Sequence, residues 1–279
     1  MTFLPAASFS AGALAAALAQ APPSTTCADI EEFLRNGSVG AMRNLPRGVT
    51  LPKRATLTQG GLKHDASIQT VNETKTSFQG KRGMELNFRD FWGYNIAGYE
   101  IAKMLDLNMV PPYVERKAGG SSASFTWWVD DAMMEIDRLQ KKIQPPDVEA
   151  WNQQMFVARV FNQLIRNSDD NLTNFLITKD WQLWMIDFTR AFRTPKDIAH
   201  PENLVRIDRR LLANLKKLDR QALEEKVVKP RYLTRAELDG VMARRDKIVD
   251  FFERQIAAKG ESAVLFDLDR VGQPCGVGL

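Results

Sequence analysis

The stretch Leu164–Phe192 reads LIRNSDDNLTNFLITKDWQLWMIDFTRAF, and it decides which fold the chain is expected to adopt. Three polar residues, Asp169, Asn174 and Asp187, lie in it among apolar neighbours. Asp169 belongs to a turn after a long apolar helix, Asn174 comes just before a short apolar strand, and Asp187 follows a second strand. Because two strands joined as a hairpin bring such positions together, we expect the three side chains to converge on one point.

The side chains at these three positions have the chemistry of a phosphoryl-transfer site. Carboxylate and carboxamide oxygens suit a hard cation, particularly Mg²⁺ that keeps its waters and shares the phosphates of a substrate. The carboxylate that holds no metal can accept the proton of an attacking hydroxyl. The alternative is that Asn, Ser and Asp gather here because turns favour them. That alternative explains Asn167–Asn171, but it explains less well Asp187, a charge that lies between apolar residues.

The composition is that of an ordinary globular protein, with 44% hydrophobic and 26% charged residues among 279. This length fits one large domain or two small lobes. The net charge of +4 is mild, and Lys and Arg are interleaved with Asp and Glu, so we expect no nucleic-acid partner. Neither of the two cysteines, Cys27 and Cys275, has a second Cys or a His at zinc-ligand spacing. Two unpaired thiols are the favoured interpretation, while a disulfide stays open if the chain ends meet.

The first residues resemble a signal peptide. Ala11–Ala19 (AGALAAALA) is a short apolar run followed by small residues, and it is too short to span a membrane. The absence of Lys or Arg before Arg35, and Pro22 just after the expected cut, leave an Ala-rich tail as the alternative. We expect an exported protein, periplasmic or secreted, if the signal is real, and a cytoplasmic protein otherwise. No other stretch is long and apolar enough to predict a transmembrane segment.

Residues 27–129 are expected to form a small lobe built on antiparallel strands. Strand-like runs alternate with turn residues such as Gln59-Gly60-Gly61. The polar stretch Asn72–Asn87 is expected to be a loop. The predicted elements are a helix at Asp29–Asn36, strands at Val39–Leu45, Val49–Thr58 and Leu62–Val71, a helix at Phe91–Leu105, and strands at Val110–Arg116 and Ser124–Val129.

Residues 130–269 are expected to form a larger lobe that is mainly helical. Asp147 is a good N-cap for an apolar helix at Val148–Arg166. Thr234–Glu237 (TRAE) reads as a capping box, and it predicts a last helix that ends before Gly260.

Together the two halves predict an α+β fold of two lobes, a small antiparallel-sheet lobe and a larger helical lobe, with a cleft between them. The joint is expected near Val129–Met133. Residues 1–26 are then a signal peptide and linker, and residues 270–279 are a tail.

The central motifs resemble those of the protein-kinase-like superfamily. The pattern D-x-x-x-x-N, a strand and then I-D-F is similar to its catalytic loop and metal loop. The wording N-S-D-D-N-L-T-N-F-L-I and W-M-I-D-F-T-R-A-F resembles the atypical branches, namely type II phosphatidylinositol 4-kinases, HipA-type bacterial kinases and secretory-pathway kinases. It is also similar to uncharacterised bacterial proteins with an IDFTRAF-type segment. The resemblance covers roughly Val39–Gly260. It implies Asp169 as catalytic base, Asn174 and Asp187 as metal ligands, and ATP with Mg²⁺ or Mn²⁺ as cofactors.

The residues that hold the nucleotide phosphates in that superfamily are less clear in this sequence. No G-x-G-x-x-G occurs, and Pro46–Thr50 is the only candidate phosphate loop. The resemblance implies a lysine near Gln69 on the third strand and a glutamate near Asn95 on the following helix. Lys75 and Glu100 are displaced candidates for these two roles. The candidate nucleotide-binding residues are therefore Gly48, Thr50, Lys75 and Glu100.

The resemblance implies an atypical kinase that transfers the γ-phosphoryl group of ATP to a hydroxyl acceptor on a protein, a lipid or a small molecule. The alternative is a catalytically weak or inactive pseudokinase that acts as an exported binding or scaffold module, which Gln69 and Asn95 favour. The sequence specifies neither the acceptor nor the oligomeric state.

Arginine and tryptophan residues near the motifs have both a functional and a structural interpretation. Arg190 and Arg193 can clamp a phosphate, although a surface ion pair is the commoner role of such residues. Trp127 and Trp128 can line an adenine pocket, although paired tryptophans in a strand more often pack in a core.

Overall fold

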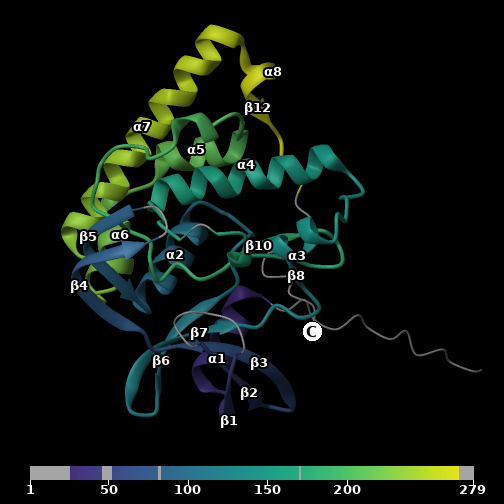
Figure 1. Ribbon diagram of the computed structural model, residues 1–279, viewed down its shortest axis with the longest axis vertical. Coiled ribbons are helices and arrows are strands. Elements are labelled where there is room, and N and C mark those ends of the chain that lie inside the picture. The colour runs from purple at the N-terminus through teal and green to yellow at the C-terminus, as the bar shows by residue number, and fades with distance from the viewer. Residues whose placement is uncertain (1–25, 46–51, 81–82, 170, 270–279) are drawn as a thin grey trace, which may run out of the picture.

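The structure of the protein is a computed structural model, and it describes residues 26–45, 52–80, 83–169 and 171–269. A small lobe built on an antiparallel sheet lies at the bottom of Figure 1, and a larger lobe of helices lies above it. The predicted α+β fold with these two lobes is confirmed. Residues 1–25 of the expected signal segment, the loop Pro46–Thr50 and the tail at 270–279 fall outside the described residues.

Five strands form the sheet of the small lobe in the order β1-β2-β3-β7-β6, and every neighbouring pair is antiparallel. β6 lies at one edge, as the prolines before it predict. Gln69, the last residue of β3, lies opposite Ser124 of β7. The strands are β1 (Ser38–Asn44), β2 (Lys53–Gln59), β3 (Leu62–Gln69), β6 (Tyr113–Ala118) and β7 (Ser121–Trp127).

Helix α1 (Cys27–Asn36) packs against this sheet. It begins at a capping box, in which Thr26 and Asp29 satisfy each other's backbone N–H groups. Phe33 and Leu34 are buried in a core cluster with the inward-facing residues of β2, β3 and β7. Burial of this apolar face is what holds so short a helix on the sheet.

Cys27, at the start of α1, is disulfide-bonded, so the expectation of two unpaired thiols is wrong. The chain contains one other cysteine, Cys275, which lies outside the described residues. The sequence could not predict this outcome, because pairing depends on where chain ends distant in sequence lie in space.

The stretch Asn72–Asn87 is part of a β-hairpin, so the predicted loop is wrong. β4 (Asn72–Gly80) and β5 (Gly83–Phe91) pair antiparallel along their length, and in the chain they lie between β3 and α2. Most of their side chains are exposed, and β4 (NETKTSFQG) is polar except at Phe78, so it lacks the apolar–polar alternation that reveals a strand. Phe78 and Phe88 stack on the partly buried side, with ring centroids 4.2 Å apart.

Helix α2 (Gly93–Met104) is buried over most of its circumference and belongs to the core of the helical lobe, together with Phe161 and Phe188. A Cβ atom at Gly98 would lie 2.7 Å from Cδ2 of Phe188, closer than real Cβ contacts. The helix and the Phe188 ring can therefore pack only because Gly98 carries no side chain. This contact fixes the residue that follows Asp187.

Helix α4 (Val148–Ile165) runs across the middle of the helical lobe, with α7 (Arg235–Lys259) beside it (Figure 1). Asp147 caps α4 by accepting a hydrogen bond from the Ala150 N–H at 3.0 Å, as predicted. The predicted capping box Thr234–Glu237 begins α7. None of the described helices is long and apolar enough to cross a membrane. The other helices are α3 (Glu135–Gln140), α5 (Arg209–Lys217), α6 (Arg220–Leu223), a π-helix (Glu224–Val228), α8 (Glu261–Val264) and 3₁₀ turns at Leu172–Asn174 and Pro201–Asn203.

Three short strands lie at the joint of the lobes, in the order β10-β9-β8. β9 (Phe175–Ile177) and β10 (Leu183–Met185) form the predicted hairpin, and β8 (Met133–Met134) pairs with β9. Asn174 thus precedes β9 and Asp187 follows β10, which brings the two residues to the same end of the hairpin. A parallel pair of strands, β11 (Ile207–Asp208) and β12 (Leu265–Phe266), completes the helical lobe.

Candidate active site

A cleft of about 1300 Å³ opens between the two lobes. Its walls come from β3 and β7 of the sheet, from the β4–β5 hairpin, and from the turn and strand ends around β9 and β10. Asp169, Asn174 and Asp187 all line it. The three residues predicted from the sequence therefore lie in one cavity, as expected from the hairpin that joins their strands.

Asp169 presents one carboxylate oxygen to the cleft. Its backbone N–H donates to Asn167 Oδ1 at 3.1 Å, and its Oδ1 accepts from Asn171 Nδ2 at 2.8 Å. The turn is attached to the segment after β10, because the Ser168 N–H and hydroxyl both donate to the Arg190 carbonyl. With 37% of its side chain exposed, Asp169 keeps Oδ2 accessible to a substrate. This is the environment that a general base needs.

Asn174 is oriented by its amide nitrogen. Nδ2 donates to the Asp169 carbonyl at 2.9 Å, and the Asn174 carbonyl accepts from the Ile186 N–H at 3.0 Å. Among the described residues, the side-chain oxygen Oδ1 has only a long contact of 3.5 Å, to the Thr173 hydroxyl. Asn174 therefore offers an oxygen ligand from a fixed side chain next to Asp169.

Asp187 is a half-buried carboxylate with a left-handed backbone, φ = 59°. Its N–H donates to Tyr113 Oη at 3.3 Å, and its Oδ1 accepts from Thr189 Oγ1 at 3.0 Å. Burial raises the pKa of Asp187, against the lowering effect of hydrogen bonds from Thr189 and Gln69. Within the described part of the chain no Lys or Arg forms an ion pair with this carboxylate.

The oxygens of Asn174 and Asp187 fit a divalent cation. A half-buried carboxylate with no ion pair to a Lys or Arg among the described residues is stabilised when a cation binds, and the weakly bonded carboxamide oxygen of Asn174 supplies a second ligand. Across the described ranges no three His, Cys, Asp or Glu side chains cluster as a metal site. Mg²⁺ needs no such cluster, because it is commonly held by one or two protein oxygens, waters and substrate phosphates.

Gln69 and Asn95 form a neutral amide pair at the positions where the resemblance implies lysine and glutamate. Asn95 Nδ2 donates to Gln69 Oε1 and, at 3.1 Å, to Ser124 Oγ. Asn95 Oδ1 accepts from the Phe188 N–H at 2.7 Å. Asn95 is fully buried, so these contacts satisfy groups that have no access to water. The pair connects β3, α2 and the segment after β10 without any charge.

Of the other candidate nucleotide-binding residues, Lys75 and Glu100 do not line the cleft. Lys75 Nζ pairs with Glu73 at 2.9 Å on the exposed hairpin, and Glu100 lies 3.5 Å from Lys103. Neither Lys75 nor Glu100 is among the described residues that line the cleft. Gly48 and Thr50 lie outside the described residues.

Arg190 lies at the cleft wall, three residues after Asp187. Its Nε donates to Asp90 Oδ2 at 2.8 Å, and its Nη1 lies 3.7 Å from Asp169 Oδ2. Arg193 instead pairs with Glu85 of the hairpin at 2.9 Å and does not line the cleft. From the sequence, both an ion pair and a phosphate clamp were possible roles for Arg190. Its partner Asp90 belongs to none of the sequence motifs, so this ion pair could not be predicted.

The two tryptophans have different surroundings, although both line the cleft. Trp127 is buried and stacks on His64, with ring centroids 3.5 Å apart. Its indole N–H is buried without a hydrogen-bond acceptor among the described residues. The guanidinium of Arg54 lies 4.0 Å from the Trp128 ring centroid. Trp127 therefore packs in the sheet core and also forms part of the cleft wall.

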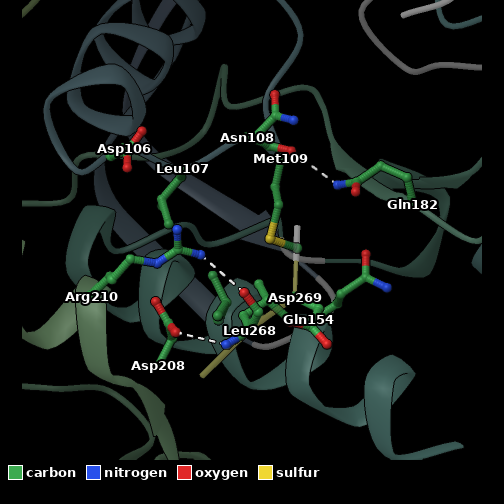
Figure 2. Close-up of a pocket in the computed structure, with 11 residues that line it drawn as sticks. Asp106, Leu107, Asn108, Met109, Gln154, Gln182, Asp208, Arg210, Leu268 and Asp269 are labelled. Carbon is green, nitrogen blue, oxygen red and sulfur yellow. Dashed lines mark hydrogen bonds between the residues drawn. The ribbon is translucent and has the colours of Figure 1, made fainter. Parts of the chain in front are cut away.

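A much smaller pocket, of about 30 Å³, is lined by residues 106–109 after α2 and by Gln154, Gln182, Asp208, Arg210 and Leu268 (Figure 2). Its polar groups are used to hold the C-terminal segment. Asp208 accepts from the N–H groups of Leu211 and Leu268 at 3.0 Å each, and Arg210 donates to the Leu268 carbonyl at 3.0 Å. The pocket has room for a water molecule and carries no functional assignment.

Known structures share the fold of this chain. No protein-family model matches it, and no curated protein matches it. The chain is similar to a structure of hydra Fam20 with sugar, with a TM-score of 0.64, 12% identity, and coverage of 88% of this chain and 93% of that chain. It is also similar to the Golgi casein kinase, with a TM-score of 0.61, 12% identity, and coverage of 86% and 77%. This likeness shows that the fold is an atypical protein-kinase-like fold.

Proposed function

We propose that this protein is an atypical kinase that transfers the γ-phosphoryl group of ATP to a hydroxyl acceptor. The observation that carries the proposal is the convergence of Asp169, Asn174 and Asp187 in one cleft of a kinase-like fold. An accessible carboxylate beside two cation-binding oxygens is the set of groups that phosphoryl transfer requires.

In the proposed reaction Asp169 Oδ2 orients the acceptor hydroxyl and takes its proton. The acceptor oxygen forms a bond to the γ-phosphorus, the bond from that phosphorus to the bridging oxygen breaks, and the electron pair leaves with ADP. Asn174 Oδ1 and the Asp187 carboxylate hold Mg²⁺ or Mn²⁺, which neutralises phosphate charge when bound. The hydrogen bond from the Thr189 hydroxyl to Asp187 Oδ1, and the one from the Asp187 N–H to Tyr113 Oη, fix Asp187 for this role.

The acceptor class is proposed from chemistry and from the two similar structures. One of them is described with a sugar and the other as a casein kinase, so sugar and protein hydroxyls are the first acceptors to test. Lipid headgroups and small molecules remain within the proposal, because Asp169 selects a hydroxyl and not the molecule that carries it. Export through the N-terminal segment is part of the proposal as well.

The second candidate function is a pseudokinase that binds a partner or nucleotide without turnover. The neutral pair of Gln69 and Asn95 favours it, since no charge is supplied at the positions that hold the phosphates in the resembling kinases. The two candidates differ in whether bound ATP is turned over.

The test combines nucleotide binding with phosphoryl transfer. Thermal unfolding is measured with ATP in the presence of Mg²⁺ or Mn²⁺, with chelator, and for Asp187→Ala. Ligand at a hundred times its dissociation constant adds about 2.7 kcal/mol to the free energy of unfolding. We expect this stabilisation in the wild type, and we expect chelator or Asp187→Ala to abolish it. Asp250→Ala, an exposed change on α7, is the matched control.

Transfer of labelled phosphate distinguishes the two candidates. We expect Asp169→Ala to bind ATP and to lose transfer by at least about a hundredfold, in line with loss of a general base. Binding without transfer in the wild type would favour the pseudokinase. Absence of any nucleotide-dependent shift with either metal would sink both nucleotide proposals.

A further inference from the structure

Among the described residues that line the cleft, Arg190 is the only Lys or Arg. Glu85, Asp169 and Asp187 also line it, and the position expected to carry a lysine holds the neutral Gln69. The phosphate chain of ATP carries several negative charges, so acidic walls without a cation would repel it. If the proposed function holds, a cation other than a β3 lysine has to meet these phosphates.

Arg190 is held in place before any ligand arrives. Its Nε donates at 2.8 Å to Asp90, a carboxylate only 2% exposed. The guanidinium lies beside the rings of Phe78 and Phe88, 5.5 and 5.4 Å from their centroids. A charge-assisted hydrogen bond on one edge and aromatic contacts fix the plane of the group, so little rotamer freedom is lost when a phosphate binds.

The edge of the guanidinium opposite Asp90 is available to a ligand. Nη1 lies 3.7 Å from Asp169 Oδ2, which is longer than a hydrogen bond. For Nη2, no hydrogen bond is found to any described residue. Two parallel N–H groups on such an edge match two oxygens of a phosphate. The edge lies next to the carboxylate proposed to receive the acceptor's proton, which is where the transferred group has to be.

We propose that Arg190 binds the terminal phosphoryl group of the nucleotide, the group that is transferred, and so supplies the charge that the Gln69–Asn95 pair does not. This inference rests on the proposed function. Arg190 donates two hydrogen bonds to the γ-phosphoryl oxygens and stabilises the charge on them during transfer. Asp90 is a positioning residue that holds Arg190 through Nε.

The proposal predicts that Arg190 discriminates ATP from ADP, because ADP lacks the group that Arg190 contacts. The test measures ATP and ADP affinities at fixed Mg²⁺ for the wild type and Arg190→Gln. We expect Arg190→Gln to weaken ATP binding about tenfold or more and to leave ADP affinity unchanged. Arg190→Lys keeps the charge but loses the fork, and it should recover part of the ATP affinity. Arg159→Gln on the exposed side of α4 removes the same charge away from the cleft and should match the wild type.

Arg190→Gln leaves the buried Asp90 without its partner and can fail to fold. The double variant Asp90→Asn/Arg190→Gln removes both charges, and circular dichroism establishes that it is folded before nucleotides are added. It should show the same selective loss of ATP affinity. An unchanged ATP-to-ADP affinity ratio, or an equal loss for both nucleotides, would overturn the assignment of Arg190 alone. A wild type that binds neither nucleotide would overturn the proposed function together with it.

Discussion

The hydrogen-bonded pair of Gln69 and Asn95 connects β3 with α2, as an ion pair would, but it carries no charge. Asn95 holds the Phe188 N–H and, through Gln69, connects the end of β3 to α2. A buried ion pair needs excellent geometry to offset the desolvation of both charges, whereas a satisfied amide pair does not. The site is therefore fixed at this point while its electrostatics are left to other residues.

Restoring the charges one at a time tests this interpretation. We expect Gln69→Lys to lower the free energy of unfolding by about 1 to 3 kcal/mol, because the new ammonium loses the contact with Asn95 and has only the Asp187 carboxylate as a partner. Asn95→Glu should also destabilise. The double variant should recover much of the loss, since lysine and glutamate then pair. Urea denaturation of the four proteins gives the coupling energy, and a value below about 0.5 kcal/mol would contradict the pairing.

The residues of the site differ in how far the sequence could predict them. Asp169, Asn174 and Asp187 lie in one motif, and local turn and strand signals were enough to bring them together. The contact of Gln69 with Asn95 spans 26 residues, and that of Arg190 with Asp90 spans 100. Such contacts depend on how the lobes pack, which no local pattern encodes.

At the scale of elements, α1 is fastened to α2 by one carboxylate. Glu31 accepts hydrogen bonds from Lys103 at 2.7 Å, from Arg35 at 2.8 Å and from Tyr99 at 2.9 Å. Burial alone would raise the pKa of Glu31, but the hydrogen bonds from Lys103 and Arg35 outweigh it, so the pKa lies below its ordinary value of 4.5. The ionised form is thus bound more tightly by the folded state.

A depressed carboxylate pKa gives a stability contribution that is present above the unfolded-state pKa and is lost as pH falls through the folded-state pKa. We expect Glu31→Gln to be less stable than the wild type at pH 7 by about 2 kcal/mol, from the lost charge-assisted hydrogen bonds. The difference should shrink as pH falls below about 4.5. Urea midpoints from pH 7 to pH 3 measure it, and a difference independent of pH would exclude this role of the charge.

The β4–β5 hairpin is the element that the sequence predicted least well. Its first strand, β4, is polar except at Phe78, so this strand lacked the signal that identified β2 and β3. The N-cap of α4 and the capping box of α7 could be predicted, because a cap involves residues only three positions apart in the sequence. The sequence predicted the elements that bury one apolar face, and it did not predict the β4–β5 hairpin, most of whose side chains are exposed.

At the scale of the whole molecule, Arg244 of α7 joins three parts of the helical lobe. Its Nε donates to the Leu164 carbonyl at 2.8 Å, and its Nη1 donates to the Arg193 carbonyl at 3.0 Å and to the Pro195 carbonyl. The side chain is fully buried, and no carboxylate pairs with it in the ranges that the structure describes. This guanidinium satisfies the end of α4 and the segment downstream of Asp187 together.

We expect Arg244→Met to lower the free energy of unfolding by about 2 to 3 kcal/mol, because buried carbonyls lose their donors. Arg254→Met on the same helix removes an exposed ion pair with Asp250 and should cost less than about 1 kcal/mol. Urea midpoints at pH 7 compare the variants, provided the m-values agree. An Arg244→Met protein as stable as the wild type would contradict this prediction. It would mean that the free-energy cost of desolvating the guanidinium equals the stabilisation from its hydrogen bonds.

The contact between Gly98 and Phe188 has a consequence for how relatives of this chain can vary. The ring fills the space that a side chain at position 98 would need, 2.7 Å from an added Cβ. A larger residue at position 98 is therefore compatible only with a smaller one at position 188. The two positions are expected to covary through evolution, although one lies in a helix and the other in the motif beside Asp187. A record of paired substitutions at these positions would trace which lineages kept this arrangement of the helix and the motif.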